Sequence, residues 1–212
     1  MRNGSITGEC NPAEISAAEL IGLLGGTAKQ KTQIQENHEE RDNIVEISNL
    51  SAKNLFNINL VLKKGEILGI SGLAGSGQTE LLNLIFRSKK KNHNKVHVQG
   101  SVSYVSGDRA KEGIFPLWSI LDNMLIANLH QVQSGLFLSR EKSESLAQHW
   151  YDKLKFKAEG IDSPITSLSG GNQQKALIAR GIASGADIII LNDPTAGVDI
   201  ETKQEIYSLL HE

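Results

Sequence analysis

Little in the sequence points to covalent cross-links or to a membrane segment. Cys10 is the single cysteine, so no internal disulfide can form, and no Cys/His spacing resembles a zinc site. No apolar run approaches the roughly 20 residues that a spanning helix needs. The polar start MRNGSITGEC lacks the basic-then-apolar layout of a signal peptide. The sequence therefore predicts a reducing, cytoplasmic setting, with any membrane role exerted through a partner.

An excess of charge of one sign is also missing. Lys and Arg total 22 and Asp and Glu total 24, which gives a net charge of −2. Such a balance offers no broad basic field to a phosphate backbone, so we expect no nucleic-acid partner. Hydrophobic residues make up 39% and charged residues 22% of the 212 positions, as in an ordinary soluble globular protein. A folded α/β domain is the expectation.

A polar stretch divides the chain into a short and a long piece. Residues 27–43 contain Ile34 as their only large apolar residue, which predicts a linker. In the short piece, Ser16 followed by Glu19 predicts the capping box of a short helix. Residues 1–26 cannot form a core alone, so they are either a frayed arm or part of another domain.

The apolar pattern of the long piece alternates between strand and helix periods. Strands are expected at 44–47, 58–62, 67–70, 96–98, 102–105 and 188–191, and helices at 79–86, 120–154 with a break near 134–135, 176–182 and 200–210. Ile188–Leu191 is uninterruptedly apolar, as in a fully buried parallel strand. We expect residues 67–70 to lie beside it in one sheet.

A glycine-rich loop lies between the expected strand at 67–70 and the helix that follows. It matches the phosphate-loop pattern except at one position; the candidate nucleotide-binding residues are Gly72, Gly75, Ser76, Gly77, Gln78 and Thr79. The glycines let backbone N–H groups face a phosphate at the helix N-terminus, and Thr79 could ligate Mg²⁺. Gln78 stands where the pattern has lysine, and the lost charged hydrogen bond is worth roughly 1.5–3 kcal/mol. The open alternative is a strand-to-helix turn without a ligand.

The most specific string is LSGGNQQK, residues 168–175. A serine and two glycines at a helix start present a hydroxyl, bare amides and the helix dipole to one anion. With KGEILGISGLAGSGQTELL, SYVSGDRAKEGIF and IIILNDPTAGVDIETKQEIY in the same order, it resembles the ABC transporter family, in particular the second cassette of monosaccharide importers. The resemblance covers about residues 44–212 and makes residues 1–26 the tail of a preceding cassette.

The resemblance implies the fold and the remaining site residues. The fold would be a P-loop NTPase core with a mainly parallel sheet and an α-helical subdomain at about 120–168, and the chain would end before the strands that complete the family's sheet and carry its switch histidine. Asn192 would lie in the Mg²⁺ shell, Asp193 would stand for the catalytic Glu, and Asp108 and Asp199 would face nucleotide or partner. For Asp108, a plain surface turn is the open alternative. Ser169, Gly170 and Gly171 would contact ATP, with Ser169 and Gly171 assisting catalysis.

The altered residues bear on what such a cassette can do. Asn192 removes a charge from the metal shell, and Asp193 is one methylene shorter than Glu; a misplacement of about 1 Å can cost 100-fold in rate. ABC cassettes pair head to tail, so the resemblance implies an ATPase whose intact signature serves a partner cassette, coupled to permease subunits and a periplasmic or extracellular sugar-binding protein at the inner face of the membrane. The alternative is a catalytically inactive nucleotide-binding or scaffolding remnant that supplies only the signature motif. A DNA-repair ATPase would need long coiled coils, which the sequence lacks.

Overall fold

The computed structural model describes residues 15, 16, 19, 41–88 and 94–211. Most of the expected tail at 1–26 and linker at 27–43 therefore lies outside the described residues. The expected capping box is confirmed, because Glu19 N–H donates to Ser16 Oγ over 3.3 Å and Ser16 N–H donates to Glu19 Oε2 over 2.9 Å. Glu19 itself is helical.

A three-stranded antiparallel sheet forms one side of the molecule. It has the order β2-β1-β3, with β1 at Asn43–Ala52, β2 at Leu55–Lys63 and β3 at Val96–Val98. Helix α2 (Gln78–Ser88) packs on it through Leu81 and Ile85, which are almost fully buried. Because β1 alternates between inward apolar and outward polar side chains, Val45 and Ile47 join the same core.

Strands β4 (Val102–Val105) and β7 (Ile188–Leu191) form a parallel pair. Their register sets Tyr104 opposite Ile190 and Val105 opposite Leu191. Helix α6 (Gly170–Ala183) leads into β7, and α7 (Ile200–His211) follows it. The pairing brings the two candidate loops after β4 and β7 to the same edge, because parallel strands end on one side.

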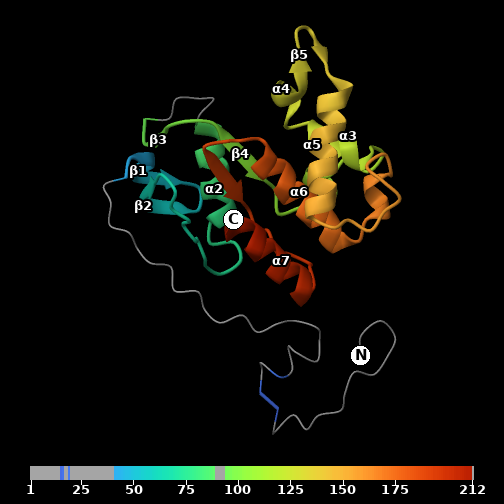
Figure 1. The fold of residues 1–212 in the computed structure, drawn as a ribbon. Helices are drawn as coiled ribbons and strands as arrows, with labels where there is room; N and C mark the ends of the chain where they lie inside the picture. The colour runs from blue at the N-terminus through green and yellow to red at the C-terminus, as the bar shows by residue number, and fades with distance from the viewer. Residues whose placement is uncertain (1–14, 17–18, 20–40, 89–93, 212) are drawn as a thin grey trace.

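Helical elements gather at the other end of the molecule (Figure 1). They comprise the π-helix η1 (Arg109–Gly113), α3 (Ile120–Leu125), α4 (Leu129–Val132), α5 (Arg140–Lys153) and the 3-10 helix η2 (Ile165–Ser167), with a short hairpin of β5 (Gln133–Ser134) and β6 (Phe137–Leu138) at the expected break. That residues 120–168 act as a separate subdomain stays a prediction.

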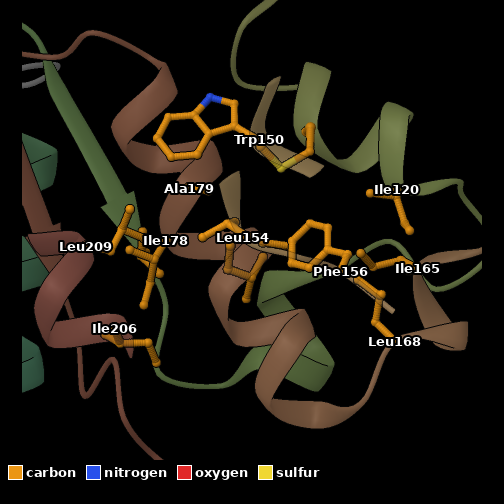
Figure 2. Packing of buried hydrophobic residues seen from close by; sticks show 14 residues of the cluster. Ile120, Trp150, Leu154, Phe156, Ile165, Leu168, Ile178, Ala179, Ile206 and Leu209 are labelled. Carbon is orange, nitrogen blue, oxygen red and sulfur yellow. The ribbon is translucent and has the colours of Figure 1, made fainter. Parts of the chain in front are cut away.

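A second apolar core joins these helices to α6 and α7. Figure 2 shows its members facing one another, among them Ile120, Trp150, Leu154, Phe156, Ile165, Leu168, Ile178, Ala179, Ile206 and Leu209. Ile178 and Ile206 are completely buried. Helix α6 is thus held by packing on both α3 and α7.

The expected strand at 67–70 is wrong. No strand is assigned to residues 66–72, and Ile67 is 70% exposed. Instead of pairing with β7, the segment lines a groove of about 380 Å³ whose other wall is Ile188–Leu191. The predicted mainly parallel sheet is correspondingly reduced to the β4–β7 pair among the described residues, while the P-loop α/β class is confirmed.

Within the described part of the chain, no helix is both long and apolar enough to cross a membrane.

Candidate functional site

The glycine-rich loop has the backbone that its sequence predicts. Gly75 and Gly77 have φ angles of +83° and +98°, a region that glycine enters without steric cost. A Cβ on Gly77 would also lie 2.8 Å from the Asn54 carbonyl oxygen. Helix α2 begins directly afterwards at Gln78, so its first unpaired N–H groups face the loop. The loop therefore has the form of an anion cradle.

Gln78 turns its side chain back over this cradle. Its Nε2 donates to the Leu73 carbonyl oxygen over 3.1 Å. The same nitrogen would be 2.6 Å from a Cβ on Gly72, so a side chain at position 72 would collide with it. A neutral amide thus spans the loop at the point where the pattern has an ammonium group.

Thr79 and Asn192 come together across 113 positions of sequence. Thr79 Oγ1 donates to Asn192 Oδ1 over 3.3 Å, and Asn192 Nδ2 donates to the Tyr104 hydroxyl over 3.3 Å. Burial disfavours the phenolate and is the main reason why the pKa of Tyr104 is raised above its ordinary value. Tyr104 therefore keeps its hydroxyl proton at neutral pH.

Thr79 and Asn192 fit a magnesium ion in their donor chemistry. Both offer oxygen atoms, the ligand type that Mg²⁺ takes, and Mg²⁺ usually binds through one or two protein oxygens, water and substrate phosphates. Thr79 is exposed and stands in the first turn of α2, beside the phosphate loop. Neither residue carries a charge, so the pair can hold the ion only together with the phosphates of a nucleotide.

Asp193 follows Asn192 in an unusual conformation. Its φ is +46°, and it is exposed. Non-glycine residues in this region carry strain of about 1–3 kcal/mol. The turn is closed by the hydrogen bond from Ala196 N–H to the Asp193 carbonyl oxygen. The carboxylate is therefore at the surface beside the metal-fitting pair, where an added water can reach it.

The signature residues lie at the N-terminus of α6, where Ser169 is exposed and Gly170 and Gly171 are half-buried. Ser169 is the N-cap, and its Oγ accepts from Asn172 N–H over 3.3 Å. Helix α6 is anchored to its neighbours by Lys175. This buried side chain donates to Glu205 of α7 over 2.9 Å and to the Leu154 carbonyl oxygen over 3.1 Å. A rigid helix start thus presents the hydroxyl and free amides outwards.

Two neighbouring segments lie against this helix start. A Cβ on Gly170 would be 2.9 Å from Arg109 Nη2, and one on Gly171 would be 2.7 Å from Thr202 Oγ1. Thr202 is in turn held by Asp199, which accepts from its N–H over 2.9 Å and from its hydroxyl over 2.8 Å. The backbone bond is the main reason why the pKa of Asp199 lies below its ordinary value. Asp199 and the signature therefore share one surface.

Asp108 caps η1 and accepts from Lys111 N–H over 3.1 Å. The structure thus places it beside Arg109 and the signature, and a nucleotide contact by Asp108 stays a prediction. Among the described residues, the hydrogen bonds of the phosphate loop and of the signature form two separate groups, one around Thr79 and Asn192 and one around Ser169.

Sequence reasoning missed Tyr104 and Arg109 as members of these groups. Tyr104 could have been found from its place in β4, because the side chains of registered residues in parallel strands share a face of the sheet. Arg109 was visible in the string GDRAKEG, but nothing in the sequence indicates that it reaches Gly170.

The glycine loop at the start of α2, together with the parallel strands, defines a phosphate-loop protein of the ATP-binding cassette fold. A family model described as ABC transporter matches residues 55–196. The chain belongs to the ABC transporter family.

Curated relatives are sugar-import proteins by name. The ribose import ATP-binding protein RbsA of Halalkalibacterium halodurans is 35% identical over 100% of this chain and 46% of its own length. The xylose import ATP-binding protein XylG of Photobacterium profundum is 30% identical over 99% of this chain and 46% of its own length. The chain spans less than half the length of these relatives.

Solved structures agree on the fold. A metal-chelate type ABC transporter in an inward-facing conformation matches with a TM-score of 0.66 at 27% identity, over 80% of this chain and 68% of that one. The dimeric ATP-binding cassette MJ0796 bound to ADP and Pi matches with a TM-score of 0.64 at 24% identity, over 78% of this chain and 81% of that one.

Proposed function

We propose that this chain is an ATP-binding cassette of an importer for a simple sugar. Its relatives are named as ribose and xylose import ATP-binding proteins, and its loop and α6 N-terminus are two anion-binding arrangements of the kind that phosphates occupy. Residues 44–212 would form the cassette and residues 1–26 the tail of a preceding one. Which sugar is carried would depend on other subunits.

The two halves of the site would have different tasks. The observation that carries this division is that the signature is complete, with Ser169 exposed at the start of an anchored helix. In contrast, the chain's own nucleotide site has amides at Gln78 and Asn192 and a shortened acid at Asp193. Ser169, Gly170 and Gly171 would act on ATP held by a partner cassette, and the chain's own loop would bind ATP weakly and turn it over slowly.

In the chain's own nucleotide site, each residue would have a different role. The loop amides and Thr79 would bind and orient the phosphates, and Asn192 would hold the cation through its carbonyl oxygen. When bound, Mg²⁺ would neutralise phosphate charge. Asp193 would accept a proton from water, but its short side chain places the carboxylate too far back for fast hydrolysis.

The partners follow from the head-to-tail arrangement. A second cassette would complete each ATP site, permease subunits in the membrane would receive the motion, and a periplasmic or extracellular sugar-binding protein would deliver the sugar. The chain would act in the cytoplasm at the inner face of the membrane. No nucleic acid is involved in this proposal.

The test is steady-state phosphate release by the full transporter. Ser169→Ala should lower the rate by about 100- to 1,000-fold, because a donor to a phosphate in transfer is worth most in the transition state. Gln78→Ala should have a far smaller effect, since its nucleotide stays intact. Ser167→Ala is the matched control, because within the described ranges the Ser167 hydroxyl bonds only the Pro164 carbonyl oxygen.

Equal losses for Ser169→Ala and Gln78→Ala would contradict the division of tasks. The proposal also competes with the scaffolding remnant, which is favoured by the neutral amides at Gln78 and Asn192. A transporter whose rate falls in Ser169→Ala, although this chain's own phosphate loop binds no nucleotide, would support that second function.

A further inference from the structure

We propose that Tyr104 is a positioning residue for the metal site: its hydroxyl orients the Asn192 side chain so that the carbonyl oxygen, and not the NH₂ group, faces Thr79 and the cation of a bound nucleotide. This inference rests on the proposed function, because it concerns the site where that function places Mg²⁺.

In the structure, each end of the Asn192 amide bonds a different hydroxyl group. The Asn192 NH₂ donates to Tyr104 over 3.3 Å, and the Asn192 carbonyl oxygen accepts from Thr79 over 3.3 Å. An asparagine side chain has one acceptor end and one donor end. Bonding the donor end to Tyr104 therefore leaves the acceptor end for the side where Thr79 lies.

Strand register explains why Tyr104 reaches Asn192. Tyr104 is opposite Ile190 in the parallel β4–β7 pair, and Asn192 comes two residues after Ile190. Side chains two residues apart point to the same face of a strand. The backbone continues the pairing, because Asn192 N–H donates to the Val105 carbonyl oxygen over 3.0 Å.

Packing fixes both side chains in place. The Tyr104 ring lies 5.3 Å, centroid to centroid, from Phe86, which belongs to the same helix as Thr79. On the other side, a Cβ on Gly107 would lie only 3.4 Å from Asn192 Nδ2. The half-buried Asn192 amide is therefore bordered by Gly107, Tyr104 and Thr79.

The orientation matters because the residue is an amide. If the group turned by half a rotation, its N–H hydrogens would face a divalent cation, which binds oxygen and repels them. An aspartate has two equivalent oxygens and needs no such control. The Tyr104 hydroxyl therefore matters because residue 192 is an amide whose orientation must be set. Its effect on metal binding should disappear when Asn192 is replaced by Asp.

This dependence gives a double-mutant test. We would compare the wild-type chain, Tyr104→Phe, Asn192→Asp and the double variant, measuring Mn²⁺ affinity by electron paramagnetic resonance with a non-hydrolysable ATP analogue. Tyr104→Phe keeps the ring on Phe86 and should weaken Mn²⁺ binding about 3- to 10-fold, as loss of one hydrogen bond predicts. In the Asn192→Asp background, the same change should alter the affinity less than about twofold.

Tyr151→Phe is the matched control. It removes a tyrosine hydroxyl that bonds the Ala158 carbonyl oxygen, far along the chain from Thr79 and Asn192, so it should leave Mn²⁺ affinity unchanged. Binding of the analogue without metal should be the same for wild type and Tyr104→Phe.

Two results would overturn the inference. They are an unchanged Mn²⁺ affinity in Tyr104→Phe and an equal loss of affinity in both backgrounds, which would indicate general damage. A wild-type chain that binds neither metal nor analogue would instead contradict the proposed function, and the inference with it.

Discussion

At the scale of single residues, two neutral amides stand where a nucleotide site usually has charge. Gln78 bonds its own loop through the Leu73 carbonyl oxygen, and Asn192 bonds Thr79 and Tyr104. Each amide is therefore held by protein groups. Both substitutions keep hydrogen-bonding ability and lose charge, which should weaken phosphate binding without disturbing the fold.

Restoring the lysine should restore affinity. Gln78→Lys should tighten Mg-ATP binding about 10- to 100-fold, because a charged hydrogen bond to phosphate contributes roughly 1.5–3 kcal/mol. Isothermal titration calorimetry measures the affinity of each variant for Mg-ATP. Gln148→Lys adds the same charge on the exposed face of α5 and should leave the affinity as it is. An unchanged affinity in Gln78→Lys would mean that the loop does not hold phosphates.

At the scale of elements, the turn from the 66–72 segment into α2 depends on Gly77. Gly77→Ala should lower the free energy of unfolding by about 1–3 kcal/mol, because alanine is strained at a φ of +98° and its Cβ would meet the Asn54 carbonyl oxygen. Gly69→Ala is the matched control, with nothing within 4 Å of its added Cβ. Urea unfolding measures the free energy of unfolding of both variants. Equal losses in Gly77→Ala and Gly69→Ala would contradict the expectation.

Asp187 links the turn before β7 to the start of β4. Its carboxylate accepts from Ser101 N–H over 2.7 Å and from the Ser101 hydroxyl over 2.8 Å, and the backbone bond is the main reason why its pKa lies below its ordinary value. The folded pKa is depressed, so the stabilisation is present above the ordinary pKa of about 3.9. It is lost as the pH falls through the folded value.

Asp187→Asn should therefore lower the melting temperature at pH 7, and the difference from wild type should shrink below about pH 4. Thermal melts between pH 7 and pH 3 measure the difference in melting temperature between wild type and Asp187→Asn. A difference that stays constant over this range would show that the carboxylate charge is not what stabilises the link. Asp152→Asn, at an exposed pair with Gln148, provides the comparison.

Local patterns predicted most elements but not all of their pairing. The alternation at 58–62 and the apolar run at Ile188–Leu191 predicted strands correctly, but the run is not fully buried as expected, because Ile189 is 37% exposed. Residues 67–70 have the same apolar composition, yet Ile67 is 70% exposed. A strand requires a partner ladder, and a local pattern does not encode which neighbour lies beside it. Tyr104 escaped notice for the same reason, because its role depends on the register with β7.

At the scale of the whole molecule, two cores support two anion-binding helix starts. One core holds α2 and the phosphate loop, and the other holds α6 and the signature. Figure 1 shows the β2-β1-β3 sheet and the helices α3, α4 and α5 at opposite ends, with β4 and α6 between them. In a head-to-tail pair, each cassette could then give its loop to one nucleotide and its signature to the other.

The most direct test is the nucleotide content of the full transporter after one turnover. The transporter would be loaded with radiolabelled Mg-ATP, allowed one turnover, separated by rapid filtration and analysed for bound ATP and ADP. Our account predicts one ADP and one intact ATP per cassette pair, because only the partner's nucleotide faces the complete machinery. Two ADP molecules per pair would show that this chain's own site hydrolyses ATP and would contradict the account.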